Sequence, residues 1–369
     1  MKLVCVIASL GCGGAERVLS TLVNAWARER PVAVVTFDHG DTAPFFALDP
    51  RVVHTAISLD KTSRWFGEGA INNLGRIRRL RAELRRQAPD LIVSFGDRTN
   101  ILTLLASRSL GVPVVVSERV DPRLYSPGAI WSALRRAVYP LAATIVVQTE
   151  RTREYLRSRL KAPLVVIPNP IAEPDGATGD DDVRDAVIVA IGRLQPQKGF
   201  DVLLRGFSRM SSRFSNWRLL IVGDGPLRQF LEDTARSLTV SDRVSFPGLL
   251  PETGSVLRRA GIFALTSRFE GFPNALAEAM AHGCAVVATD CPTGPAELID
   301  DGVSGLLVPV DDADALGAAL DRLAGDPDLR RRLGSAAAQA VAPYRPDRIV
   351  PQWNRLLENV AVAHTQREA

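Results

Sequence analysis

Hydrophobic and polar positions alternate in blocks along this chain of 369 residues. Short apolar runs recur, and a stretch with helical spacing follows almost every one. Uninterrupted apolar runs of this kind are typical of parallel strands that are covered by helices on both faces. The pattern predicts doubly wound parallel sheets, whose ligands bind beyond the carboxyl ends of the strands. The predicted strands are residues 3–9, 32–37, 91–95, 114–117, 145–147, 164–167, 187–191, 219–222, 262–265 and 285–289.

The clearest strand–helix–strand unit begins with the apolar run 262–265. Gly271 and Pro273 mark a turn into a helix, and proline is well tolerated at the first helical position. Gly283 is placed where a left-handed residue ends a helix. The run 285–289 is then the next strand, so this region predicts one βαβ unit.

The start of that helix is a candidate anion site. The backbone N–H groups of the first turn, residues 272–276, have no helical partners and lie at the positive end of the helix dipole. Glu270, Asn274 and Glu278 are spaced four apart and share one edge. Amides suit phosphate and carboxylates suit hydroxyls, so the group fits a phosphorylated sugar. The spacing by itself favours a simpler interpretation, in which Glu278 faces water.

The surrounding motifs resemble a known family. Glu270-x7-Glu278, Cys291-Pro-Thr-Gly-Pro-Ala-Glu-Leu-Ile and Asp301-Gly-Val-Ser-Gly-Leu-Leu-Val-Pro are similar to the signature of the retaining family-4 glycosyltransferases. The branch they resemble adds sugars during assembly of bacterial lipopolysaccharide, capsule and lipid-linked oligosaccharides. The resemblance covers both halves of the chain and implies an α/β protein of the GT-B fold. In this fold two Rossmann-like doubly wound domains face a central cleft.

The length exceeds the usual size of one core, so two domains are expected. Residues 168–182 are rich in Pro, Gly and Asp, which predicts a linker. We interpret the acidic run 180–182 within it as a solvated segment rather than a metal site. We expect an acceptor-binding domain at 1–168, a linker at 169–185 and a nucleotide-sugar-binding domain at 186–345. Residues 346–369 form an amphipathic helix that, by the resemblance, crosses back to the first domain.

The loop Gly192-Arg193-Leu-Gln-Pro-Gln-Lys198-Gly199 carries a guanidinium and an ammonium after a predicted strand. Two such cations can hold a diphosphate from two sides. The resemblance identifies this loop as the diphosphate loop, and it implies catalytic roles for Arg193, Lys198 and Glu270. It also implies that Glu270 binds sugar hydroxyls and Glu278 the ribose diol. The expected donor-binding residues are Gly14, Arg193, Lys198, Gly223, Leu249, Glu270, Gly271, Phe272, Pro273, Asn274, Ala275 and Glu278.

A glycine-rich loop, residues 11–14, follows the first predicted strand. Glycines let backbone amides approach a ligand closely. A dinucleotide fingerprint is the competing interpretation, with Asp38 ending the next strand, but Glu16 holds the place of its third glycine. The resemblance places Gly13, Gly14 and Glu16 in the cleft.

Two further loops follow predicted strands, at residues 95–98 and 117–119, and ligands are expected beside both. Many relatives have a histidine near the second loop, where this chain has Arg119. The expected acceptor-binding residues are Gly13, Glu16 and Arg119.

Charge is unevenly distributed along the chain. Residues 1–168 contain 24 Lys and Arg against 14 Asp and Glu, whereas the formal net charge of the whole chain is only +4. Six arginines lie between Asn72 and Arg86, around an apolar stripe of Ile77, Leu80 and Leu84, and Trp65-Phe66 lies just upstream. This helix is either a solvated face or a surface for anionic lipid headgroups. No nucleic-acid-binding motif accompanies the charge.

Other classes are disfavoured by composition. No apolar run approaches the roughly 20 residues needed to span a bilayer, and the apolar start is too short for a secretory signal. Four cysteines and four histidines show neither a disulfide framework nor metal spacing. We therefore expect no cofactor and no metal. The expected location is the cytoplasm, as a peripheral protein on the inner face of the membrane.

The resemblance implies a retaining, metal-independent glycosyltransferase. It would move a hexose or N-acetylhexosamine from a nucleoside diphosphate sugar, expected to be a UDP-sugar, to a growing lipid-linked glycan. Its partners would be the donor, a lipid-linked or glycan acceptor and an anionic membrane surface, with no nucleic acid. The alternatives are a non-catalytic nucleotide-sugar-binding protein, a transferase with a soluble acceptor, and a nicotinamide-dependent oxidoreductase.

Overall fold

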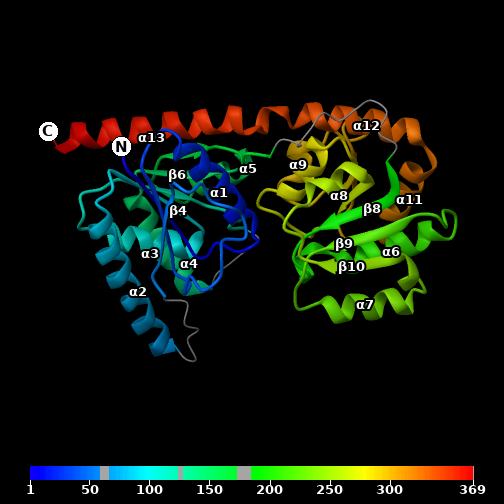
Figure 1. Ribbon diagram of the computed structural model, residues 1–369, viewed down its shortest axis with the longest axis horizontal. Helices are drawn as coiled ribbons and strands as arrows, with labels where there is room; N and C mark the ends of the chain where they lie inside the picture. Colours follow the sequence, from blue (N-terminus) through cyan, green and yellow to red (C-terminus); the bar gives the residue numbers. More distant parts are fainter. Residues whose placement is uncertain (59–65, 124–127, 173–183, 369) are drawn as a thin grey trace. The chain divides into compact units, whose positions relative to one another are not determined.

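The computed structural model describes residues 1–58, 66–123, 128–172 and 184–368. The chain divides into two compact units (Figure 1). Unit 1 comprises Met1–Pro170 and Asp347–Ala369, and unit 2 comprises Ile171–Pro346. Each unit has one parallel sheet with helices on both faces, so the predicted pair of Rossmann-like domains is confirmed.

Unit 1 has a seven-stranded sheet in the order β3-β2-β1-β4-β5-β6-β7. Its strands are β1 (Leu3–Ile7), β2 (Val32–Thr36), β3 (Val53–Ala56), β4 (Leu91–Phe95), β5 (Val114–Ser117), β6 (Thr144–Val147) and β7 (Leu164–Val166). Its helices are α1 (Gly14–Trp26), α2 (Phe66–Gln87), α3 (Asp97–Ser107), α4 (Ala129–Val138), the 3-10 turn η1 (Tyr139–Leu141), α5 (Glu150–Arg157) and α13 (Pro346–Glu368).

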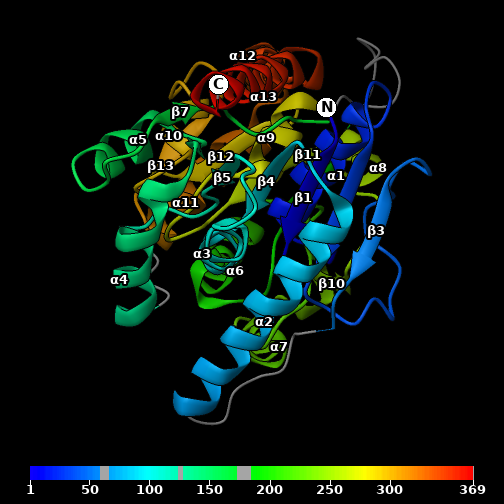
Figure 2. The same ribbon diagram turned by 90° about the vertical axis from the view of Figure 1, so that its left-hand side faces the viewer.

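The two faces of this sheet have separate cores. Helices α1 and α13 pack on one face around Trp26 and Trp353. Helices α2 to α5 pack on the other, where Leu80 and Leu84 of α2 are fully buried (Figure 2). These two leucines belong to the apolar stripe noted in the sequence, whose third member, Ile77, is half-buried.

Unit 2 has a six-stranded sheet in the order β10-β9-β8-β11-β12-β13. Its strands are β8 (Asp185–Ile191), β9 (Arg218–Val222), β10 (Val244–Gly248), β11 (Ala260–Leu265), β12 (Ala285–Thr289) and β13 (Leu306–Val308). Its helices include α6 (Phe200–Ser211), α7 (Arg228–Ser237), α8 (Gly254–Arg259), α9 (Asn274–Ala281), α10 (Pro295–Leu298), α11 (Ala313–Gly325) and α12 (Pro327–Ala340), with 3-10 turns at η2 (Pro196–Lys198), η3 (Ser241–Arg243) and η4 (Ala342–Tyr344).

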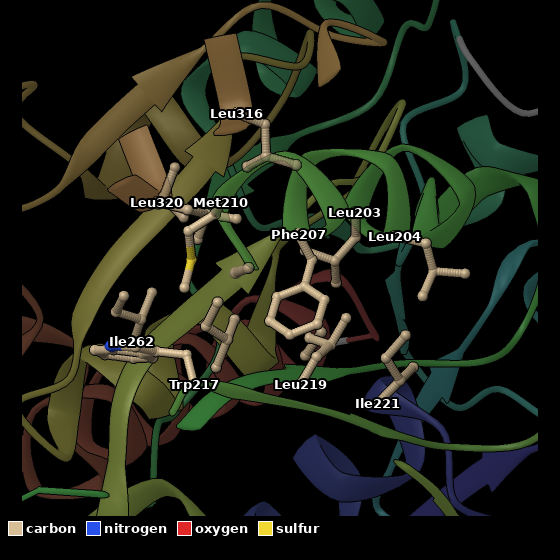
Figure 3. Close-up of a cluster of buried hydrophobic side chains, with 14 of the residues drawn as sticks. Leu203, Leu204, Phe207, Met210, Trp217, Leu219, Ile221, Ile262, Leu316 and Leu320 are labelled. Carbon is tan, nitrogen blue, oxygen red and sulfur yellow. The ribbon is translucent and has the colours of Figure 1, made fainter. Parts of the chain in front are cut away.

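One face of the unit 2 sheet is covered by α6 and α11. Phe207 and Met210 of α6 meet Leu316 and Leu320 of α11 over the strands (Figure 3). The two helices approach closely at Gly206, where an added Cβ would lie 3.0 Å from Leu316. This packing holds the first turn of α6, and the loop before it, against the sheet.

Sequence patterning missed β3, β10 and β13. In β10 only Val244 is buried, and the residues after it are exposed or half-buried. The edge strand β3 contains exposed Val53 and half-buried His54, so it has no continuous apolar run. Strand β13 has only three residues. Asp185, expected to end the linker, instead begins β8. The acidic run 180–182 and Trp65 lie outside the described residues.

Helix α13 belongs to the core of unit 1, although unit 2 separates it from the rest of that unit in the sequence. Trp353 is 1% exposed, and its ring lies edge-on to Trp26 and stacks on Phe95 at the end of β4. The last helix therefore supports the strand end from which one of the candidate ligand loops leaves. Among the described helices, none combines the length and apolar character that would let it cross a membrane.

We predict that Trp353→Ala destabilises unit 1 by about 3–5 kcal/mol, the usual cost of truncating a buried tryptophan. Urea unfolding followed by circular dichroism measures this. Arg355→Ala, on an exposed position of the same helix, should stay within about 0.5 kcal/mol of wild type. Equal unfolding midpoints for the two variants would contradict the packing role of Trp353.

Candidate active site

The loop after β8 makes a tight turn before α6. Gly199 ends the η2 turn with φ +61°, a left-handed conformation that favours glycine. A Cβ at this position would overlap the backbone carbonyl oxygen of Thr266. The Thr266 hydroxyl in turn donates to the carbonyl oxygen of Lys198 at 2.9 Å. The loop after β8 is therefore fixed against the end of β11.

Lys198 and Glu270 form an ion pair. The Lys198 Nζ donates to Glu270 Oε1 at 2.6 Å, and the Ser267 hydroxyl donates to the same oxygen at 2.5 Å. The Glu270 side chain is only 7% exposed, so its charge depends on these partners. Two residues with predicted catalytic roles thus meet, although 72 positions separate them. The sequence spacing did not predict the pair.

Arg268 ties the surrounding loops together. Its Nε donates to Asp311 at 2.8 Å and its Nη2 to Asp201 at 3.1 Å. Its backbone N–H donates to the carbonyl oxygen of Gln197 at 2.8 Å, and its Nη1 donates to that of Pro196. Because these partners lie in η2, α6 and the loop before α11, Arg268 holds the backbone that carries Lys198.

A second layer supports Glu270 from behind. The Thr293 hydroxyl donates to the Glu270 carbonyl oxygen, and Gln197 Nε2 donates to that of Phe269 at 2.9 Å. Burial, with a smaller contribution from the nearby Glu270 charge, raises the pKa of Cys291 to about 12, so Cys291 stays a thiol. No role was assigned to Thr293 or Gln197 from the sequence, because single polar residues in loops have no periodic signal.

Helix α9 begins later than expected. Asn274 is its first residue and Pro273 is the N-cap residue, which offers no side-chain acceptor. The Asn274 N–H donates to the carbonyl oxygen of Phe272 at 3.0 Å. The N–H groups of Ala275 and Leu276 have no acceptor among the described backbone groups. The predicted anion site is therefore limited to the N–H groups of Ala275 and Leu276 and does not extend over all of residues 272–276.

Glu278 does not face water, contrary to the simpler interpretation of its spacing. It is 6% exposed, and Leu276 and Met280 beside it are fully buried. A carboxylate in such a place has to be paired or hydrogen-bonded. Glu278 and Glu270 are both buried, while Asn274 between them is half-buried.

The remaining expected donor residues of unit 2 lie at the carboxyl ends of β8, β9 and β10. Arg193 is exposed, and no described residue pairs with its guanidinium. Gly223 approaches the β8 loop so closely that a Cβ there would overlap the Gly192 carbonyl oxygen. Leu249 is 49% exposed. Arg193 and Leu249 are therefore accessible at these strand ends, whereas Gly223 is buried.

In unit 1 the glycine-rich loop leads into α1, with Gly13 as the N-cap residue. A Cβ at Gly13 would overlap the carboxylate of Glu16, which therefore folds back over the loop. A carboxylate already lies at the positive helix end, where a dinucleotide would place its pyrophosphate. This arrangement argues against the oxidoreductase interpretation.

Arg119 is held in place by two contacts. Its Nη1 donates to Asn169 Oδ1 at 2.5 Å, and its guanidinium lies 4.7 Å from the centre of the Phe95 ring. Burial lowers the pKa of Arg119 to about 9, while the charges of Glu118 and Glu16 oppose the shift. Arg119 thus keeps its charge at neutral pH and lies within the electrostatic reach of Glu16.

Glu118 is the centre of a buried polar network, a role that sequence reasoning did not assign. It is 1% exposed, and its Oε2 accepts from the Tyr139 hydroxyl at 2.7 Å. Arg135 Nη1 lies 3.7 Å from the same oxygen, and Asn100 Nδ2 donates to the Tyr139 hydroxyl at 3.2 Å. Burial raises the pKa of Glu118 to about 7 against the opposing effects of Arg135 and Tyr139.

The two halves of the chain match two different protein families. Residues 12–173 match the family described as Glycosyltransferase Family 4, and residues 179–340 match Glycosyl transferases group 1.

In the part of the chain that the structure describes, no group of three or more His, Cys, Asp or Glu could hold a metal ion.

Solved structures with the same fold include sucrose-phosphate synthase from Thermosynechococcus elongatus, with a TM-score of 0.82, 19% identity and coverage of 98% of this chain and 99% of that one. Anabaena Alr3699/HepE in complex with UDP and glucose has a TM-score of 0.80 and 19% identity, with coverage of 97% and 99%. These likenesses confirm the GT-B fold.

Two relatives match nearly the whole chain. An alpha-1,4-N-acetyl-D-galactosaminyltransferase of Campylobacter jejuni, named for an undecaprenol diphosphate-linked substrate, is 29% identical over 98% of this chain and 99% of its own length. The amylovoran biosynthesis glycosyltransferase AmsD of Erwinia amylovora is 28% identical over 94% of this chain and 96% of its own. The protein is a glycosyltransferase. It consists of a Glycosyltransferase Family 4 domain followed by a Glycosyl transferases group 1 domain.

We predict that Gly199→Ala destabilises unit 2 more than Gly302→Ala does. Both glycines have positive φ, +61° and +75°, so alanine adds left-handed strain of about 1–2 kcal/mol at each. Only position 199 adds an overlap with Thr266, since nothing lies within 4 Å of a Cβ at 302. Thermal unfolding of the two variants gives the comparison, and equal losses would show that the contact with Thr266 does not constrain the loop.

Proposed function

We propose that this glycosyltransferase acts with retention of configuration. It would move a hexose or N-acetylhexosamine from a UDP-sugar to a growing lipid-linked glycan. The observation that carries the proposal is the Lys198–Glu270 pair in unit 2. It joins the predicted diphosphate loop to the loop before the free amides of α9.

The leaving diphosphate would be stabilised by unit 2. Arg193 has no competing partner among the described residues, and the N–H groups of Ala275 and Leu276 are available at a helix start. Lys198 would share its charge between Glu270 and the phosphate. Preorganised charges that face developing negative charge are usually the largest contribution to catalysis. Two fixed cations and two amides supply that charge, so the proposal includes no metal.

Glu270 would bind hydroxyls near the reacting carbon, and Glu278 the ribose diol. In the transfer, the bond between the anomeric carbon and the phosphate oxygen breaks and the diphosphate leaves with the electron pair. The acceptor oxygen forms the new bond on the same face, and its proton passes to the departing diphosphate. This course gives retention without a covalent enzyme intermediate.

The acceptor would bind to unit 1 through Gly13, Glu16 and Arg119, and Gly14 would contact the donor. The Campylobacter relative is named for a substrate linked to undecaprenol diphosphate, which supports a lipid-linked acceptor for this chain. A non-catalytic nucleotide-sugar-binding protein is the main alternative. Slow release of UDP from nucleotide sugars by the purified protein would exclude this non-catalytic alternative. A thermal-shift panel of nucleotide sugars identifies the donor, because a ligand that binds the folded state raises the stability of the protein.

We predict that Arg193→Ala and Lys198→Ala each lower turnover by about 10²-fold or more, as expected when a group opposite developing charge is removed. Initial rates of UDP release with a nucleotide sugar and acceptor measure this. Arg213→Ala, which removes a surface ion pair with Asp321 and a contact with the Phe214 ring, is the control and should keep the wild-type rate. Near-wild-type rates for both site variants would contradict the proposal that Arg193 and Lys198 bind the leaving diphosphate.

Helix α2 is proposed to hold the protein at the inner face of the cytoplasmic membrane. The structure narrows its basic surface, because Arg81 donates to the carbonyl oxygens of Leu105 and Ala106, and Arg76 donates to Asn73. The arginines that remain exposed are Arg78, Arg79, Arg85 and Arg86, of which Arg86 pairs with Glu83. Basic residues near an anionic surface contribute about 1 kcal/mol each.

We predict that the protein pellets with anionic vesicles at low salt and is released at about 1 M salt, where the Debye length falls to about 3 Å. Changing Arg78, Arg79, Arg85 and Arg86 to Glu should abolish pelleting and leave UDP release from the donor unchanged. Neutral vesicles serve as the control. If the wild-type protein ignores anionic vesicles at low salt, α2 is only a solvated face.

A further inference from the structure

The two ends of unit 2 are tied to each other. The chain enters this unit after Pro170 and leaves it after Pro346. The Ile171 N–H, the first of the unit, donates to the carbonyl oxygen of Tyr344 at 2.8 Å. Ile171 is 2% exposed, and the half-buried Tyr344 packs against the same hydrophobic cluster. We call this contact between Ile171 and Tyr344 the junction.

The junction contacts the loop that carries Glu270. The Tyr344 ring lies edge-on to the ring of Phe272, with 5.9 Å between the ring centres. Phe272 is half-buried and belongs to the predicted donor loop, directly before Pro273. Its ring packs against the same cluster as Ile171. A ligand that changes the position of Phe272 therefore acts on the side chain whose backbone holds the entry to unit 2.

On the unit 1 side of the entry, the chain positions Arg119. Asn169 stands two residues before Ile171 and is 5% exposed. Its Oδ1 accepts from Arg119 Nη1 at 2.5 Å. In the described part of the chain, Nε and Nη2 of Arg119 have no hydrogen-bond partner, so this edge of the guanidinium is open. Asn169 thus fixes the direction in which the open edge points.

The segment between these two contacts is stiff. Asn169 lies between Pro168 and Pro170. Each proline fixes its own φ angle and restricts the residue before it to extended conformations. Few rotations remain that could absorb a displacement between Ile171 and Asn169. A shift of Ile171 is therefore passed to Asn169 instead of being lost in a flexible linker.

We propose that the junction couples nucleotide binding in unit 2 to the position of Arg119 in unit 1. A nucleotide beside Phe272 moves the Tyr344 ring, and the shift reaches Arg119 through Ile171 and the stiff segment. Packed side chains and hydrogen bonds of this kind can carry coupling between distant sites. Tyr344 and Asn169 act as positioning residues. That the ligands are a donor and an acceptor rests on the proposed function; the physical link between the two loops does not.

Hydrogen exchange of the full chain, with and without saturating UDP and read by mass spectrometry, tests the coupling. UDP should slow exchange in residues 270–278. It should also change exchange about fivefold or more in residues 117–121 and 167–172, the lower range of usual coupling. Tyr344→Leu removes the ring and keeps the carbonyl oxygen, whereas Asn169→Ala removes the acceptor of Arg119. Each should abolish the response of residues 117–121 and keep the protection of 270–278.

The matched controls restore the contacts. Tyr344→Phe keeps the ring and Asn169→Asp keeps an acceptor oxygen, so both should respond to UDP as the wild type does. A general loss of stability would not separate these conservative variants from Leu and Ala in this way, and melting temperatures show that all four fold.

A wild-type protein in which UDP protects residues 270–278 but leaves 117–121 unchanged would overturn the coupling and spare the transferase proposal. So would a full response in both Tyr344→Leu and Asn169→Ala, or a response lost in Tyr344→Phe and Asn169→Asp as well. If UDP protects neither segment, the proposed UDP site fails, and the coupling fails with it.

Discussion

The ion pair between Lys198 and Glu270 is the contact on which the candidate site of unit 2 depends. It joins the loop after β8 to the loop after β11, two strands that are neighbours in the sheet. A carboxylate that is almost fully buried is stable as an anion only with such partners. The left-handed turn at Gly199 and the hydrogen bonds of Arg268 hold the loop so that the Lys198 ammonium lies next to the Glu270 carboxylate.

The same charge arrangement also sets the chemistry that unit 2 can perform. Its cations and free amides gather where parallel strands end and α9 begins, so an anionic leaving group would meet positive charge without a large rearrangement. Glu270 lowers the net charge of the loop in the absence of ligand. Arg193, in the same loop, is exposed to solvent.

Unit 1 uses the corresponding strand ends differently. Its loops after β4 and β5 carry buried polar atoms of Asp97, Ser117, Glu118 and Arg119 that have no hydrogen-bond partner among the described residues. Helix α13 supports these loops, because the Trp353 ring stacks on the Phe95 ring, and the Arg119 guanidinium lies over the Phe95 ring.

The sequence by itself determined the two doubly wound units, because buried parallel strands and amphipathic helices have strong periodic signals. It also placed Arg193, Lys198 and Glu270 in loops after strands. Only the tertiary structure decided that Lys198 pairs with Glu270, that Glu278 is buried, and that Arg119 keeps one edge open. These features depend on which strand ends become neighbours, and residues distant in the chain leave no local pattern for that. Strands β3, β10 and β13 were missed for the opposite reason, since none of them buries enough residues to produce a pattern.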